Sequence, residues 1–172
     1  MRENIEKLPP LYFRGCGECS KCCEGKFFLA PLILDDFVKV KPFFEIRAII
    51  IDEIIPVMLL TDGKNPCKYL KNGKCEIYEN RPPACKIYPF SPYFEDIFLD
   101  LDCDAIVNNM GDKLPSTKQE FFKSNFFDDR MINFKQKREK TIEYMKTQKL
   151  VFDKEIKGIS LYNFNYNSLQ NF

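Results

Sequence analysis

In the first half of the chain, apolar residues gather in runs that have the spacing of short strands and one helix. The stretch from Arg47 to Thr61 is rich in Ile, Val and Leu and predicts one or two buried strands. A shorter strand is predicted at Phe27–Leu29. A helix is predicted to begin near Asp35 or Asp36, which are good N-cap residues, and to end before Pro42. We expect these elements to form ordinary hydrophobic core.

The segment NPCKYLKNGKCEIYENRPPACKIYPF contains a predicted β-hairpin. Its Asn-Gly pair at 72–73 is a strong two-residue turn signal, and closing that turn places Leu70 opposite Cys75. The Pro-Pro pair at 82–83 interrupts the next segment. Cys85 is therefore expected on a loop or at the start of a short helix.

Beyond Gly111 no cysteine follows, and the composition turns toward Lys, Glu, Phe and Asn. Thr117 and Glu120 predict a capping box at the start of a helix. An imperfect apolar stripe that continues to about Thr147 predicts one or two helices. The end of the chain, residues 160–172, mixes Asn with aromatic residues and predicts a packed strap or a frayed tail.

Taken together, these elements predict an α+β fold in a chain of 172 residues, which is long enough for one domain with a proper core. Residues 1–112 are predicted to form a small cysteine-rich, metal-centred domain with a β-hairpin and short helices. Residues 113–172 are predicted to form a helical C-terminal extension packed on it. The segment DIFLDLDC, residues 96–103, is predicted as a further strand that ends in the last cysteine.

The composition excludes several classes of partner. Hydrophobic residues make up 45% and aromatic residues 15% of the chain, which is typical of a folded protein. With 26 basic and 25 acidic residues the net charge is +1, so no overall field attracts nucleic acid or an anionic membrane. The start is charged and lacks a signal-peptide core, and no apolar run approaches the ~20 residues of a membrane span. We therefore expect a cytoplasmic protein with no membrane span and no nucleic-acid partner.

The eight cysteines carry the strongest chemical signal. Four of them lie in CGECSKCC, residues 16–23, and a reducing cytosol favours metal ligands or redox thiols over disulfides at such spacing. The chain has no His, which excludes mixed Cys/His zinc sites and removes the commonest general base. The candidate ligands are Cys16, Cys19, Cys22, Cys23, Cys67, Cys75, Cys85 and Cys103. Two all-thiolate sites, or one site with additional redox thiols, would account for this number.

The C-x-x-C-x-x-C run formed by the first three of these cysteines resembles the loop that binds a [4Fe–4S] cluster in bacterial ferredoxins, although Cys23 follows directly. Adjacent Cys22 and Cys23 point in different directions in regular backbone. They would serve different centres, or one of them would remain an unligated redox thiol. Zinc uses the same thiolates, and the spacing favours iron–sulfur over zinc.

These motifs together are similar to the CxxCxxCC cysteine-cluster family, also labelled the YkgJ family and described as a zinc- or iron-chelating domain. The similarity covers residues from about 12 to 104, and all eight cysteines have a place in the pattern. Its further signatures are Pro66-Cys67, Ile77-Tyr78-Glu79 and Arg81-Pro82. The resemblance implies a cytoplasmic prokaryotic protein that binds zinc or an iron–sulfur cluster, distantly related to the flagellin lysine N-methylases. Within this pattern we expect Tyr78 to pack, and Glu79 and Arg81 to brace the loop of Cys85.

Two other polar clusters favour no site. An EF-hand loop starting at Asp100 would need Gly and Glu where the chain has Ala105 and Gly111, so the acids of residues 100–104 are expected on the solvent face of a strand. The basic run KQKREK, residues 135–140, is flanked by acids and predicts a solvated helix face.

The leading hypothesis is thus a protein that holds an iron–sulfur cluster or zinc through cysteine thiolates, with a structural and a potential redox role. One alternative is an enzyme, either an iron–sulfur oxidoreductase or an S-adenosylmethionine-dependent protein-modifying enzyme. A second alternative is a zinc-stabilised module that binds a protein partner. In either alternative the partner or substrate is unidentified.

Overall fold

The computed structural model describes residues 1–15, 19–26, 28–93, 96–107, 109–127 and 129–166. These residues contain both strands and helices, which confirms the predicted α+β class. Cys16, a predicted ligand, and Phe27, the start of a predicted strand, lie outside the described ranges. Within these ranges, none of the helices has the length and apolar character needed to cross a bilayer.

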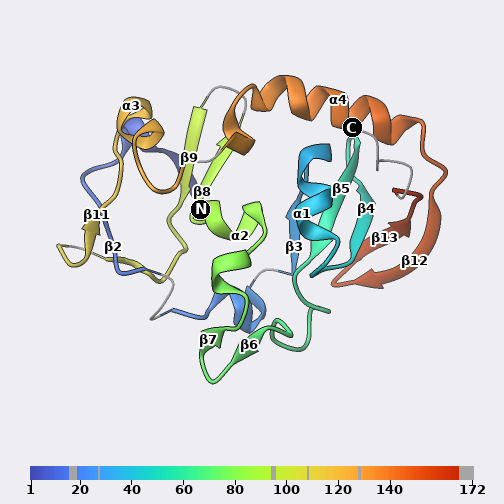
Figure 1. Ribbon diagram of the computed structural model, residues 1–172, viewed down its shortest axis with the longest axis horizontal. Helices are drawn as coiled ribbons and strands as arrows, with labels where there is room; N and C mark the ends of the chain where they lie inside the picture. Colours follow the sequence, from blue (N-terminus) through green and yellow to red (C-terminus); the bar gives the residue numbers. More distant parts are fainter. Residues whose placement is uncertain (16–18, 27, 94–95, 108, 128, 167–172) are drawn as a thin grey trace.

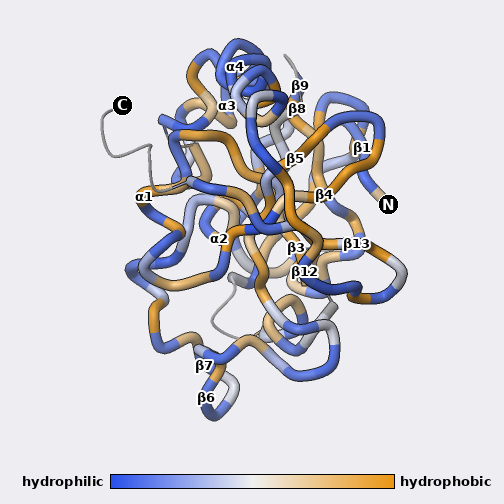
Figure 2. The backbone as a smooth tube through the Cα atoms, turned by 90° about the vertical axis from the view of Figure 1, so that its right-hand side faces the viewer, coloured by the Kyte–Doolittle hydropathy of each residue, from blue (hydrophilic) through white to orange (hydrophobic). Residues whose placement is uncertain are grey.

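The largest sheet in the described part of the chain has five antiparallel strands in the order β12-β13-β4-β5-β3 (Figure 1). Its strands are Leu29–Pro31 (β3), Ile46–Ile50 (β4), Ile54–Leu59 (β5), Val151–Ile156 (β12) and Ile159–Asn163 (β13). β4 and β5 confirm the strands predicted from the Ile- and Val-rich run. Their side chains alternate between two hydrophobic clusters, so apolar residues cover both faces of the sheet. Figure 2 shows this hydrophobic stretch in the middle of the molecule.

One face of this sheet is covered by the predicted helix. A 3-10 turn (η4, Leu34–Asp36) continues into α1 (Phe37–Val40). The Asp36 carboxylate accepts a hydrogen bond from the backbone N–H of Ile33 at 2.9 Å, which satisfies one donor at the start of the helix. The apolar side chains of α1 are buried in the same cluster as those of β4 and β5.

Two small sheets form the other side of the molecule, in the orders β1-β9-β8 and β10-β2-β11. Their strands are Arg2–Asn4 (β1), Tyr12–Phe13 (β2), Phe90–Tyr93 (β8), Asp96–Asp100 (β9), Ile106–Val107 (β10) and Asp112–Lys113 (β11), and a 3-10 turn, Ile5–Lys7 (η1), follows β1. Side chains from β8, β9 and the segments around them form a separate hydrophobic cluster. Figure 1 places β8 and β9 on one side of α2 (Pro83–Ile87) and the five-stranded sheet on the other.

The hairpin predicted at the Asn-Gly pair is present. It is formed by β6 (Leu70–Lys71) and β7 (Lys74–Cys75), and Leu70 lies opposite Cys75. Asn72 and Gly73 both have positive φ values, 50° and 73°, which is the conformation that this two-residue turn requires. The strand predicted over residues 96–103 ends earlier, at Asp100. Cys103 follows in a turn, and its N–H donates to the Asp100 carbonyl at 3.2 Å.

The C-terminal segment contains the predicted helices and two further strands. The helices are α3 (Lys118–Phe122) and α4 (Phe134–Lys146), with a 3-10 turn (η6, Asp129–Met131) between them. Thr117 caps α3 as predicted, by accepting from the Glu120 N–H at 3.1 Å. The hairpin β12-β13 was not predicted, because the sequence suggested only a strap or a tail there. β13 pairs with β4 and joins this hairpin to the five-stranded sheet. The predicted division into two domains, between residues 112 and 113, stays a prediction.

Candidate metal centre

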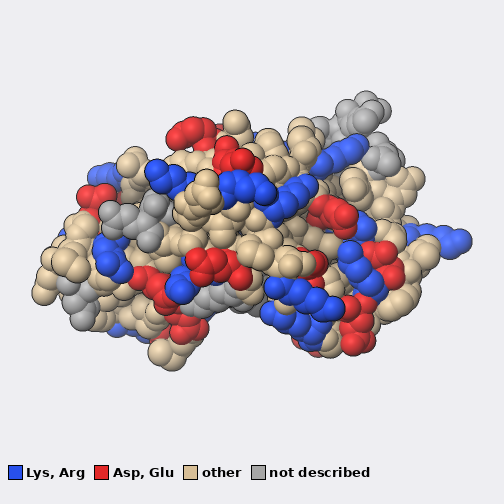
Figure 3. Space-filling model, turned by 90° about the horizontal axis from the view of Figure 1, so that it is seen from below, with Lys and Arg blue, Asp and Glu red and all other residues tan. Residues whose placement is uncertain are grey.

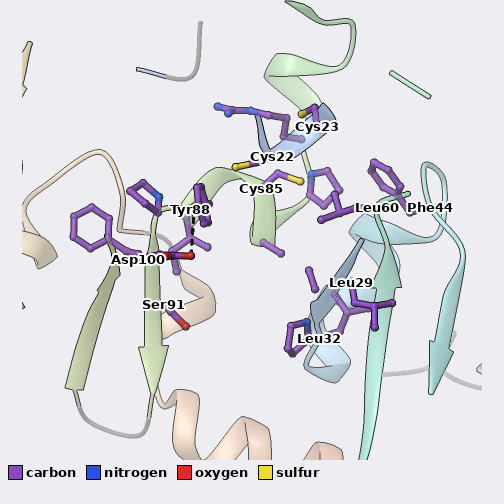
Figure 4. Close-up of a pocket in the computed structure, with 18 of the residues that line it drawn as sticks. Cys22, Cys23, Leu29, Leu32, Phe44, Leu60, Cys85, Tyr88, Ser91 and Asp100 are labelled. Carbon is purple, nitrogen blue, oxygen red and sulfur yellow. Dashed lines mark hydrogen bonds between the residues drawn. The ribbon is translucent and has the colours of Figure 1, made fainter. Parts of the chain in front are cut away.

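A cavity of about 360 Å³ lies between the five-stranded sheet, α2, β8 and α4. Seven of the eight cysteines are in the described part of the chain, and all seven line this cavity: Cys19, Cys22, Cys23, Cys67, Cys75, Cys85 and Cys103. Most of the remaining wall is apolar and includes Leu29, Leu32, Phe44 and Leu60 (Figure 4). The fold therefore brings together thiols that lie more than 80 positions apart in sequence.

The described part of the CGECSKCC segment carries three of the thiols that line the cavity, and two of these, Cys22 and Cys23, lie in a single turn. Cys22 to Lys26 form a π-helical turn, a rare element that is frequent at functional sites. Gly25 ends its helical backbone with a φ of 105°, a conformation that side-chain-bearing residues rarely adopt. The Glu24 N–H donates to the Ser20 carbonyl at 2.9 Å, and Lys21 forms an ion pair with Glu24 at 3.6 Å.

Cys67 is held directly beside this turn. Its N–H donates to the Cys23 carbonyl at 2.6 Å, and its side chain is buried. The preceding loop is fixed by Asp62, whose carboxylate accepts from the N–H groups of Lys64 and Asn65 at 2.8 and 2.7 Å. These hydrogen bonds lower the pKa of Asp62 to about 2.

The hairpin β6-β7 extends the same group of thiols. The N–H of Leu70 donates to the Cys67 carbonyl at 2.9 Å, and Leu70 pairs with Cys75 across the hairpin. Burial raises the pKa of the Cys67 thiol, and charge on Cys75 acts in the same direction. Cys67 and Cys75 are therefore near enough to interact electrostatically.

Cys85 lies in the short helix α2, which is one of the two positions predicted for it, a loop or the start of a short helix. Burial, together with charge on Cys23 and on Cys67, raises the pKa of its thiol to about 12. The guanidinium of Arg81 opposes this shift. Arg81 stacks on the Tyr78 ring at 3.7 Å and donates to the Tyr78 carbonyl at 2.8 Å. The bracing of this loop thus uses Tyr78 and Arg81.

Cys22 and Cys103 both lie near a pair of polar side chains, the half-buried Tyr88 and the buried Asp100. The hydroxyl of Tyr88 donates to the carboxylate of Asp100 at 3.4 Å and also forms a hydrogen bond with Cys22. Burial raises the pKa of Tyr88, and the charges of Cys22, Cys103 and Asp100 raise it further. Asp100 is 5% exposed, so the prediction that it lies on a solvent face was wrong, while Asp102 is exposed.

Sequence reasoning did not find Tyr88 or Asp100 as parts of the site. In the sequence Asp100 is one of several alternating acids, and only the side-by-side pairing of β8 and β9 directs it toward Tyr88. Both side chains border the cavity next to Cys22 in Figure 4. The sequence signal that could have identified Asp100 is its position as a polar residue directly after the apolar residues 97–99 of β9.

The donor set suits zinc or an iron–sulfur cluster, because both bind cysteine thiolates within a largely apolar shell. Cys19, Cys67, Cys75 and Cys85 are free thiols. In the described ranges, no group of three or more Cys, Asp or Glu side chains is close enough to hold one metal ion. The seven described thiols therefore line the cavity without three of them meeting at one point.

Charges outside the cavity are mixed in sign. Figure 3 shows basic and acidic side chains intermingled over the face seen from below, which is the face nearest the β6-β7 hairpin in Figure 1. Lys68 lies over the rings of Phe44 and Tyr69 at 5.9 and 5.0 Å and favours the ionised form of Cys67. The solvated face predicted for residues 135–140 of α4 is confirmed in part. Residues 135, 136, 139 and 140 are exposed, whereas Lys137 and Arg138 are half-buried and form ion pairs with Asp35 and Glu53.

A cavity lined by cysteines is typical of a site that binds zinc or iron through thiolates. A comparison with protein families agrees with this class of site. The family model described as "CxxCxxCC: Putative zinc- or iron-chelating domain" matches residues 15–125, which include all eight cysteines. The match covers more than half of the chain, and the chain belongs to this family. The family description supports binding of zinc or iron. No curated protein and no solved structure matches the chain.

Proposed function

We propose that the protein binds its metal through the eight cysteine thiolates, and that the metal holds together the segments that carry them. The observation that carries this proposal is the convergence of seven thiols from five segments of the chain on one cavity. Hydrophobic burial alone does not require thiols at these positions, because Val or Ala would fill the same space. Cys16 joins the set by its place in the C-x-x-C-x-x-C run.

The form of the metal that we propose is a [4Fe–4S] cluster, with zinc as the alternative. The spacing of the run favours the cluster. The neighbourhood supports either metal, because Arg81 and Lys68 offset part of the negative charge that four thiolates would bring. Binding would replace the protons that the buried thiols of Cys67 and Cys85 otherwise keep.

The test is anaerobic purification followed by elemental analysis, with an absorption spectrum taken before and after dithionite. Iron with matching sulfide and a visible band that bleaches on reduction would establish a redox-active cluster. Colourless protein with one or two equivalents of zinc would establish a structural zinc protein. A chain that takes up neither metal after reconstitution would refute the proposal.

One observation favours a second candidate function, an iron–sulfur oxidoreductase. The cavity is larger than the thiols need, and it continues between β3 and α4 along apolar side chains such as Leu32 and Ile142. Its volume falls within the range of about 300–1,000 Å³ that small-molecule sites occupy. A centre that dithionite does not reduce would exclude this candidate.

The remaining expectations stay predictions. They are the cytoplasmic location, the S-adenosylmethionine-dependent activity, the zinc-stabilised interaction module, and the lack of nucleic-acid and membrane partners.

A further inference from the structure

We propose that the cysteines form two separate centres, and that the division falls between the adjacent residues Cys22 and Cys23. Cys23, Cys67, Cys75 and Cys85 would ligate the first centre. Cys19, Cys22 and Cys103 would belong to the second. Cys16 lies outside the described residues and is assigned to neither centre. This assignment rests on the proposed function, since it divides the ligands of a metal-binding protein.

The backbone connects the members of the first group. The N–H of Cys67 bonds the Cys23 carbonyl at 2.6 Å, which places these two residues side by side. The hairpin then brings Cys75 to the same place, because its partner Leu70 bonds the Cys67 carbonyl. Cys23 and Cys85 pack against the one hydrophobic cluster in which Cys67 is buried, beneath the five-stranded sheet.

The second group belongs to the other side of the molecule. Cys103 is buried in the hydrophobic cluster of β8 and β9, and Cys19 packs against that same cluster. Cys22 reaches this side through its hydrogen bond to Tyr88. Tyr88 in turn bonds Asp100, whose carbonyl accepts from the Cys103 N–H. Figure 4 shows Cys22 on the Tyr88 side of the cavity.

The π-helical turn explains how neighbouring residues reach opposite sides. Successive side chains on a helical turn point in clearly different directions, so Cys22 and Cys23 cannot both face one centre without distortion. Cys23 packs against the cluster of the five-stranded sheet, whereas Cys22 bonds Tyr88, which packs against the cluster of β8 and β9. A doubled cysteine at this point therefore serves two centres with one segment.

Formation of the first centre must include movement of its segments. The thiols of the described residues are not within ligand distance of a common point, so the loop of Cys67, the hairpin and α2 would close on the metal as it binds. The binding free energy of the metal would supply what this ordering costs.

Two double variants test the division: Cys67→Ser/Cys85→Ser and Cys22→Ser/Cys103→Ser. Metal per chain is measured by elemental analysis, and thiol protection by alkylation followed by mass spectrometry. We expect the first variant to lose the metal of one centre and to expose Cys23 and Cys75, while Cys22 and Cys103 stay protected. The second variant should give the reverse pattern. Loss of all metal in either variant would overturn the division, and so would exposure of Cys22 together with Cys23.

Milder variants keep the test decisive if a double variant does not fold. Cys75→Ser changes only one half-exposed thiol at the hairpin and should remove the first centre alone. Cys23→Ser combined with Cys75→Ser should lose no more metal than either single variant, whereas Cys22→Ser combined with Cys75→Ser should lose the metal of both centres. Equal losses in these two combinations would refute the assignment. If the wild-type protein itself holds no metal, the proposed function fails instead.

Discussion

The two walls of the cavity differ in what holds them together. The five-stranded sheet has strands of up to six residues, and its two faces are covered by Ile, Val, Leu, Met and Phe. The cysteine segments have two-residue strands, a π-helical turn and a helix of five residues. Apolar burial and longer strands define the sheet, whereas the cysteine segments have few regular backbone hydrogen bonds of their own. From this difference we infer that the cysteine segments depend on the proposed metal more than the sheet does.

The largest effect of a single substitution is expected where the five-stranded sheet is joined to the hydrophobic cluster of β8 and β9. Arg130 is 7% exposed by its side chain and donates to the carboxylate of Asp36, which is 1% exposed, at 3.0 Å. It also donates to the Pro31 carbonyl of β3, and its neighbour Met131 belongs to the cluster of β8 and β9. Arg130→Met removes the cationic partner of a buried carboxylate and should cost about 3–5 kcal/mol in the free energy of unfolding, measured by urea denaturation.

The control for this prediction is Arg130→Met combined with Asp36→Asn. The double variant leaves no buried charge and keeps an acceptor for the Ile33 N–H, so it should be more stable than the single variant. A double variant no more stable than Arg130→Met would show that packing, rather than charge, is lost.

A core substitution in the sheet tests whether that wall is independent of the metal. Leu161 of β13 is fully buried with Ile49, Val57 and Ile156. Leu161→Ala should lower the free energy of unfolding by roughly 2–5 kcal/mol, because it removes buried methyl groups and leaves a cavity. Metal per folded chain should not change. A loss of metal in the folded variant would contradict the separation of the two walls.

A smaller effect is expected at the helix cap. Thr117 accepts from the Glu120 N–H at the start of α3, which lies outside the cavity. Thr117→Ala should cost about 1 kcal/mol in thermal or urea unfolding, with unchanged metal content. Thr117→Ser, which keeps the acceptor, should retain most of the stability. Equal losses for both variants would show that the hydroxyl is not the cause.

The smallest effect is expected from pH at the edge of the sheet. A hydrogen bond from the Arg47 side chain lowers the pKa of the Asp153 carboxyl below its usual value of 3.8. Since the folded pKa is the lower one, the stabilisation is present above pH 3.8 and is lost as the pH falls through the folded value. The stability difference between wild type and Asp153→Asn should therefore shrink below pH 4 in urea titrations. A difference that does not vary with pH would contradict this account.

The sequence predicted those elements whose signals are local. The Asn-Gly turn defined the β6-β7 hairpin and its Leu70–Cys75 register, and the Ile-rich run predicted β4 and β5. The hairpin of β12 and β13 escaped prediction. Its turn uses Lys157 and Gly158 at positive φ, and four of the six residues of β12 are exposed, so no apolar alternation marks it.

The site was predicted as a set of residues but not as an arrangement. Spacing and residue type identify thiolate ligands, because they depend only on the chemistry of Cys. Which thiols share a neighbourhood depends on tertiary contacts, such as the Cys67 bond to Cys23 and the packing of Cys19 and Cys103 on one cluster. Those contacts join residues more than 40 positions apart, and no local pattern reports them.

Hydrogen–deuterium exchange measured by mass spectrometry on metal-loaded and metal-free protein tests the central claim most directly. We predict that metal removal abolishes protection in residues 19–26, 67–87 and 99–106, while β4, β5, β12 and β13 keep theirs. Equal protection of the cysteine segments in both forms would contradict the account, and so would a uniform loss of protection across the sheet.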